Sequence, residues 1–209
     1  MNKEALNILA DAISDAGAWQ WWHMENDIVQ LEFRDVQLYD TSKSEDDTHT
    51  MDVVAIQFKG NVFAVFLDDY DEDAEKPWYE KFYDDEIPYF ECEGYELTFD
   101  DSGYAQEMYD SYRNRIPITK FDGMGALTGT KHFIAFKCGE VGAIAGGDQI
   151  GVVGRNGLIS QEEIEPLSRK WWEYWKEYWK LRGTKDALPK DPICEITIPV
   201  DKKNPEGIW

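Results

Sequence analysis

Much of the chain alternates apolar and polar residues in short runs, which is typical of half-buried antiparallel strands. Residues 18–24 (AWQWWHM) and 28–39 (IVQLEFRDVQLY) flank a polar turn and predict two such strands. The alternation of the second run is disturbed at Arg34–Asp35, which predicts a β-bulge at that point.

Further β-rich runs are separated by turn residues. The runs 51–58 and 62–69 are joined by Lys59-Gly60-Asn61, which predicts a β-hairpin. The run 89–99 (YFECEGYELTF) predicts a second hairpin with its turn near Glu93-Gly94. Residues 131–160 predict three short strands, and 193–200 (ICEITIPV) predict a final strand.

Apolar residues at helical spacing predict three helices. The first begins after Asn2, carries Leu6, Leu9 and Ile13 on one face, and ends at Gly17. The second is capped within 100–102, runs to about residue 115 and ends before Pro117. The third is the long aromatic helix that contains 168–183 (SRKWWEYWKEYWKLRG) and that Gly183 closes.

The aromatic helix has two chemically different halves. At 100° per residue its charged side chains share one half of the cylinder, and the other half carries the aromatic set Trp171, Trp175, Tyr178 and Trp179. Packing of this aromatic half on a sheet is the favoured interpretation. The alternative is that the same four residues form the wall of a pocket for a small molecule. A helix lying on a membrane surface is disfavoured, because its polar half is charge-balanced and the chain is acidic.

Together these elements predict a single α+β domain over residues 1–209. Mainly antiparallel sheets would carry an N-terminal helix, a middle helix and the long C-terminal aromatic helix packed on a sheet. We find no fixed-period repeat and no linker rich in glycine, proline or serine that would divide the chain.

Charge narrows the classes of partner. The net charge is −21, and residues 40–110 contain 22 Asp and Glu against 4 Lys. Such a surface repels phosphate backbones and acidic lipids, so nucleic-acid binding and docking to anionic membranes are disfavoured. The acidic region is interpreted as a solvated face or, more specifically, as a surface that meets a basic protein partner.

One acidic stretch within this region resembles a calcium-binding loop. Ala74 replaces the glycine of such loops, Lys76 replaces an apolar residue, and a strand precedes the loop where a helix is usual. A generic acidic loop is therefore favoured, and calcium is kept as an alternative cofactor. The acids that match the ligand spacing are Asp69, Asp71, Asp73 and Glu80.

Other catalytic and metal-binding patterns are absent from the sequence. The three histidines have no HExxH spacing, the glycines at 139–157 match no phosphate-binding loop, and there is no GxSxG motif. Cys92, Cys138 and Cys194 form no CxxC pair, which favours buried, reduced thiols over zinc ligands or a disulfide framework. The sequence therefore favours a non-enzymatic protein, and an enzyme stays open as the alternative.

Two segments carry resemblances. Residues 18–39 and 171–200 are similar to a family of bacterial proteins of unknown function, to which no activity is attached. The run CEITIPV (194–200) resembles the last strand of the GyrI-like effector-binding domains, which implies small-molecule binding in an aromatic pocket. No apolar run is long enough to cross a bilayer and residues 1–17 do not form a signal peptide, so a cytoplasmic location is expected.

The leading functional hypothesis is therefore a non-enzymatic intracellular interaction protein whose acidic 40–110 region meets a basic partner. The alternative is a small-molecule-binding domain with its pocket beside the Ser168–Gly183 helix. Oligomeric state, ligand and partner are not specified by the sequence.

Overall fold

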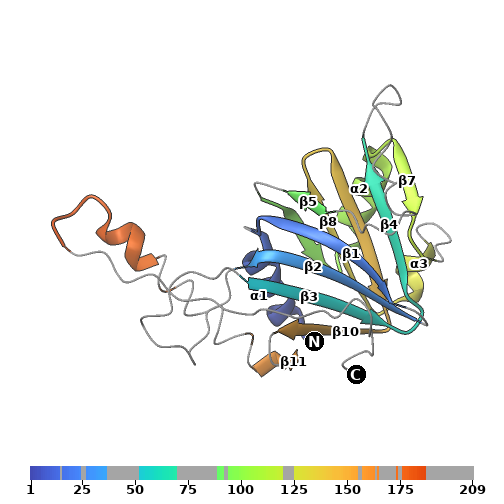
Figure 1. Ribbon diagram of the computed structural model, residues 1–209, viewed down its shortest axis with the longest axis horizontal. Coiled ribbons are helices and arrows are strands. Elements are labelled where there is room, and N and C mark those ends of the chain that lie inside the picture. Colours follow the sequence, from blue (N-terminus) through green and yellow to red (C-terminus); the bar gives the residue numbers. More distant parts are fainter. Residues whose placement is uncertain are drawn as a thin grey trace.

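The fold is that of a computed structural model, and it contains two antiparallel β-sheets with a few helices (Figure 1). The described residues are 1–14, 16–24, 27–36, 52–69, 89–91, 94–119, 125–154, 157–162, 164, 173 and 176–186. The chain is thus α+β and mostly sheet, which confirms the expected fold class at this level. The elements are α1 (Lys3–Ser14), β1 (Ala18–Met24), β2 (Ile28–Val36), β3 (Asp52–Lys59), β4 (Phe63–Asp68), β5 (Tyr89–Glu91), β6 (Glu96–Phe99), α2 (Ser102–Ser111), β7 (Asn114–Pro117), α3 (Gly125–Gly129), β8 (His132–Cys138), β9 (Val141–Gly147), β10 (Gln149–Gly154) and β11 (Gly157–Ile159).

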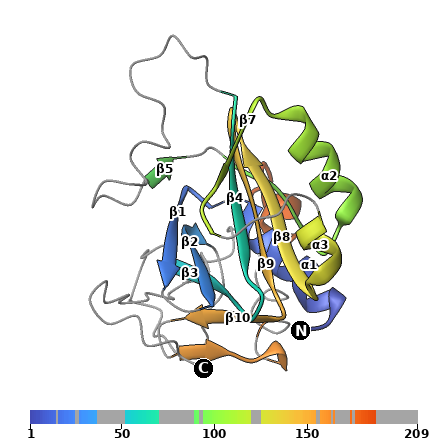
Figure 2. The same cartoon turned by 90° about the vertical axis from the view of Figure 1, so that its right-hand side faces the viewer.

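The two sheets face one another across a common core. The six-stranded sheet has the order β11-β10-β3-β2-β1-β5, and the five-stranded sheet has the order β6-β8-β9-β4-β7. Figure 2 shows the five-stranded sheet between the six-stranded sheet and the helices α2 and α3. Helix α1 packs chiefly against β6, and its buried Leu6, Leu9 and Ile13 join the core between the sheets.

Aromatic rings fill the centre of this core. The fully buried Trp19 of β1 stacks on Phe90 of β5 with ring centroids 4.5 Å apart. Trp19 also meets Phe136 of β8 edge to face at 4.7 Å, so it joins the two sheets. Because each such ring buries a large apolar area, this cluster is a principal source of the hydrophobic stabilisation between the sheets.

The outer face of the five-stranded sheet is apolar. Side chains of β4, β8 and β9 form a second buried cluster there with Met108 and Tyr112 at α2 and with Leu127 of α3. Gly146 of β9 permits close packing, because a Cβ at this position would lie 2.6 Å from the carbonyl oxygen of His132. Helix α2 therefore covers this face with its apolar side.

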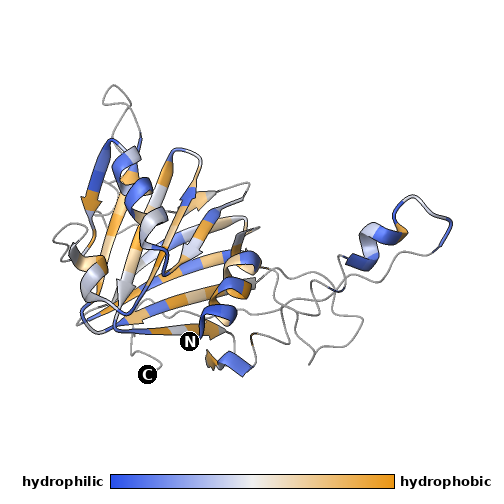
Figure 3. Cartoon of the chain, turned by 180° about the vertical axis from the view of Figure 1, so that it is seen from behind, coloured by the Kyte–Doolittle hydropathy of each residue, from blue (hydrophilic) through white to orange (hydrophobic). Residues whose placement is uncertain are grey.

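The outer face of the six-stranded sheet is polar, yet it is also buried. Its strands alternate hydrophilic and hydrophobic bands (Figure 3), and the hydrophobic residues of β1, β2 and β3 point into the core. Four polar side chains on these strands are almost fully buried, and we call them the polar ladder: Gln20, Gln30, Glu32 and Gln57. The half-buried strand predicted for residues 28–39 is thus closed to solvent at the polar side chains Gln30 and Glu32.

Both predicted hairpins are wrong. The turn at Gly60, whose φ is +74°, connects β3 of the six-stranded sheet to β4 of the five-stranded sheet. The chain likewise passes from β5 to β6 between the two sheets. Turn residues indicate that the chain changes direction. They do not determine which strand pairs with which, because that depends on packing with strands distant in sequence.

Two other predictions need correction. The middle helix ends at Ser111, and Asn114–Pro117 form strand β7 instead of its last turn. The region expected to hold three strands holds four, β8 to β11. The bulge is confirmed, because the register of β2 with β3 shifts between Phe33 and Val36.

Cys138 corrects the expectation of reduced thiols, because it is disulfide-bonded. Spacing rules detect cysteines that are close in sequence, whereas a sheet brings distant residues together. The other two cysteines lie outside the described residues.

Candidate functional site

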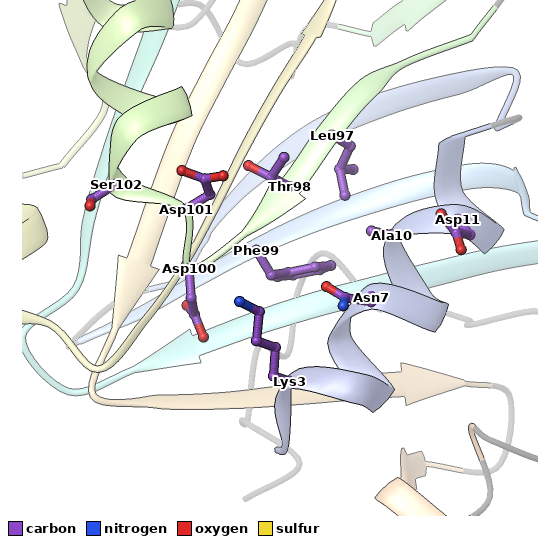
Figure 4. Close-up of a pocket in the computed structure, with 10 residues that line it drawn as sticks. All are labelled: Lys3, Asn7, Ala10, Asp11, Leu97, Thr98, Phe99, Asp100, Asp101 and Ser102. Carbon is purple, nitrogen blue, oxygen red and sulfur yellow. The ribbon is translucent and has the colours of Figure 1, made fainter.

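A cleft of about 600 Å³ separates α1 from the segment that joins β6 to α2. Figure 4 shows the side chain of Lys3 reaching from α1 toward this segment. Most of the lining is polar, with Leu97 and Phe99 of β6 as its largest apolar members. The lining residues are Lys3, Asn7, Ala10 and Asp11 of α1, Leu97, Thr98 and Phe99 of β6, and Asp100, Asp101 and Ser102.

Helix α1 forms one wall because its two faces differ. Asn2 caps the helix as predicted, since its Oδ1 accepts a hydrogen bond of 2.8 Å from the amide of Ala5. The apolar face is buried in the core. Lys3, Asn7 and Asp11 follow at intervals of four residues, so they line one exposed side of the helix.

Asp100 forms the opposite wall and is held firmly. Its φ is +56°, in the left-handed region that few non-glycine residues adopt. Its Oδ1 accepts a hydrogen bond of 2.8 Å from the amide of Phe133, and its Oδ2 lies 3.1 Å from Nδ1 of His132. These contacts fix the Asp100 carboxylate at the end of β6.

Asp101 next to it caps helix α2. Its Oδ1 accepts a hydrogen bond of 3.0 Å from the amide of Tyr104, in agreement with the cap predicted within 100–102. Two successive carboxylates therefore stand at the same side of the cleft in positions set by the backbone.

The electrostatics of the cleft favour a cation. Three carboxylates, those of Asp11, Asp100 and Asp101, share the lining with the single ammonium group of Lys3. Partial burial raises the pKa of the Asp11 carboxyl above its usual value, because the charged form loses contact with water. A cation placed beside Asp11 would compensate for this loss, so the cleft can accept an ammonium or guanidinium group.

The predicted calcium ligands are only partly described. Asp69 follows β4, and its Oδ1 accepts a hydrogen bond of 3.1 Å from the amide of Arg113. Asp71, Asp73 and Glu80 lie outside the described residues. In the part of the chain that the structure describes, no group of three or more His, Cys, Asp or Glu side chains could hold a metal ion.

The predicted aromatic pocket is also only partly described. Trp171 and Trp175 lie outside the described residues, whereas Tyr178 is half-buried and Trp179 is 59% exposed. The rings of Tyr178 and Trp179 meet edge to face at 5.6 Å, and the guanidinium of Arg182 lies 4.7 Å from the centroid of the Trp179 ring. Gly183 closes the helix as predicted, with a φ of +86°.

The sequence does not predict the cleft, although it predicts the two helix caps that border it. Asn2 and the 100–102 segment were recognised as helix caps. Their juxtaposition depends on the packing of α1 against β6, which are far apart in sequence. No local signal in the sequence reports that contact.

Comparisons with known proteins give no relative from which a function could be transferred. No protein-family model matches the chain, and no curated protein and no solved structure matches it. Among the described residues, no helix is long and apolar enough to cross a membrane.

Proposed function

We propose that the protein is an interaction protein whose acidic surface binds a basic segment of a partner. The observation that carries the proposal is the cleft between α1 and the β6–α2 segment, whose lining contains three carboxylates and one lysine. A lysine or arginine side chain of the partner would enter this cleft and pair with Asp11, Asp100 or Asp101.

The neighbouring surface supports the same partner chemistry. Helix α2 carries the exposed side chains of Glu107 and Asp110 immediately after the cleft. These charges would steer a basic partner toward the cleft, and their effect would weaken as salt screens them.

Binding of an arginine-rich peptide tests the proposal. We expect saturable binding by fluorescence anisotropy that weakens as potassium chloride is raised. Asp11→Asn should weaken binding about threefold to tenfold, because it removes one charge-assisted contact. Lys3→Ala should strengthen binding, because the competing ammonium is removed.

Glu140→Gln is the matched control, since this residue lies in the turn between β8 and β9, outside the cleft. It should leave the peptide affinity almost unchanged. Salt-independent binding, or equal effects of Asp11→Asn and Glu140→Gln, would refute the proposal.

A second candidate function is small-molecule binding at the aromatic helix, and the exposed ring of Trp179 favours it. The half-buried Tyr178 supports packing of the aromatic half of this helix, and Trp179 would stand at the edge of a pocket formed beside it. A fluorescent apolar probe, anilinonaphthalene sulfonate, should then lose binding in Trp179→Ala. Leu158→Ala, which removes another exposed apolar side chain, is the matched control, and equal losses in both variants would exclude this function.

A further inference from the structure

Strand β6 lines the cleft and is an edge strand of its sheet. The five-stranded sheet has the order β6-β8-β9-β4-β7, so β6 is paired with β8 on one side only. The consecutive residues Leu97, Thr98 and Phe99 all line the cleft (Figure 4). Because successive side chains of a strand point to opposite faces, a cleft lined by three in a row lies along the strand edge.

The register of β6 with β8 determines which backbone groups point toward the cleft. In an antiparallel pair, alternate residues direct both amide and carbonyl toward the partner strand, and the residues between them direct both groups away. The amide of Asp100 donates to the carbonyl of Phe133 in β8 at 3.0 Å. Thr98, two residues earlier, therefore also faces β8, whereas Leu97 and Phe99 face away from it.

The edge of β6 is open at Leu97 and Phe99. One step earlier, the amide of Tyr95 faces away from β8 as well, and it donates to the carbonyl of Ser14 at the end of α1 at 2.8 Å. For Leu97 and Phe99, no hydrogen bond to the outward amides and carbonyls is present in the part of the chain that the structure describes. The cleft is thus bordered by two amides and two carbonyls of an unpaired edge, on which a further strand can pair.

Carboxylates stand toward both ends of this open edge. The last turn of α1 meets the start of β6, whereas Lys3 in the first turn reaches toward Asp100 (Figure 4). Asp11 therefore lies toward the Leu97 end, and Asp100 and Asp101 follow β6 directly at the other end. At about 3.3 Å per residue, the edge from Leu97 to Asp100 is about 10 Å long, which matches about three to four extended residues.

We propose that the basic segment of the partner binds as an extended strand that pairs with the open edge of β6. Its amides and carbonyls would bond to the outward groups of Leu97 and Phe99. Its basic side chains would pair with the carboxylates at the two ends of the edge. A helical segment would leave the edge open, because its own backbone groups are already paired. This inference rests on the proposed function and specifies the conformation in which the partner binds.

Backbone N-methylation of a peptide tests the inference, because each methyl group removes one amide donor and blocks close approach of a strand. The probe is a fluorescein-labelled hexapeptide of alternating arginine and threonine, measured by fluorescence anisotropy. One version is N-methylated at all its arginines and the other at all its threonines, and each is the matched control of the other. In a paired strand only alternate amides face β6. We therefore expect one version to bind at least about tenfold more weakly and the other to stay within about threefold of the unmodified peptide.

Leu97→Pro tests the same edge from the side of the protein. Proline removes the outward amide without removing a hydrogen bond to β8, so an edge strand tolerates it. It should weaken binding of the unmodified peptide about tenfold, whereas Leu97→Ala keeps the amide and should weaken it far less. Circular dichroism checks the fold, and the methylated peptides decide the question if Leu97→Pro does not fold.

Equal affinities of the two methylated peptides would overturn the inference, because pairing with a strand edge requires alternation. Equal effects of Leu97→Pro and Leu97→Ala in folded protein would also overturn it. The proposed function would still stand if Asp11→Asn weakened binding of the unmodified peptide. Failure of the unmodified peptide to bind would overturn the proposed function and this inference together.

Discussion

The outer faces of the two sheets are built from opposite chemistry. On the five-stranded sheet, apolar side chains of β4, β8 and β9 pack beneath α2 and α3. On the six-stranded sheet, the corresponding positions of β1, β2 and β3 carry the polar ladder, which is buried to a similar degree. Both sets of side chains are closed to water, but only the set beneath α2 and α3 has the composition of a core.

This difference should appear in how much each face stabilises the folded chain. Burial of apolar area stabilises the folded chain, so the face beneath α2 and α3 should contribute strongly to the free energy of unfolding. Buried amides with incomplete pairing contribute little and can even destabilise.

Removing apolar volume from the face beneath α2 should have the largest effect. Ile144 of β9 is fully buried in this cluster, and Ile144→Ala should lower the free energy of unfolding by about 2–5 kcal/mol. Urea unfolding measures the loss, and Leu158→Ala, at an exposed position, should cost far less. A loss below about 1 kcal/mol for Ile144→Ala would show that this face is not a tightly packed core.

Alkaline pH should lower the free energy of unfolding through two tyrosines at the face beneath α2. Burial, followed by the charges of Glu96 and Glu107, raises the pKa of Tyr104 from 10.0 to about 12. Burial, followed by the charge of Asp69, also raises the pKa of Tyr112, whose hydroxyl donates to the Val141 carbonyl.

Because the folded state holds these protons more tightly than the unfolded state, their contribution to stability is intact below pH 10. It is lost as the pH rises toward about 12. Unfolding curves between these pH values should show the decline, and Tyr104→Phe should reduce its slope. An unchanged slope in this variant would mean that Tyr104 does not titrate differently in the two states.

The cap of α2 should have a smaller effect. Asp101→Ala removes the acceptor for the amide of Tyr104 and should lower the free energy of unfolding by about 0.5–2 kcal/mol. Asp101→Asn keeps a good cap and serves as the control in thermal unfolding. Equal free energies of unfolding for Asp101→Ala and Asp101→Asn would show that the Asp101 cap does not stabilise α2 on the five-stranded sheet.

The sequence predicts local features well and distant contacts poorly. The caps at Asn2 and Asp101 and the bulge after Phe33 follow from side chains close in sequence, and the structure confirms them. The strand partners of β3 and β4 do not follow from nearby side chains, because they depend on packing between segments distant in sequence. The polar ladder was hidden for the same reason, since alternation at Gln30 and Glu32 is also the pattern of a solvent-exposed strand face.

The measurement that tests this contrast most directly is the stability of Gln30→Leu/Gln57→Leu beside that of Ile144→Gln. We expect the double variant to be as stable as the unaltered chain or more stable, because both partners of the Gln57–Gln30 hydrogen bond are replaced together by apolar groups. Ile144→Gln should be destabilised by about 2 kcal/mol or more, because it buries an amide in an apolar cluster. A loss of about 2 kcal/mol or more in the double variant would contradict the account, since these two amides would then stabilise the fold as strongly as core side chains do.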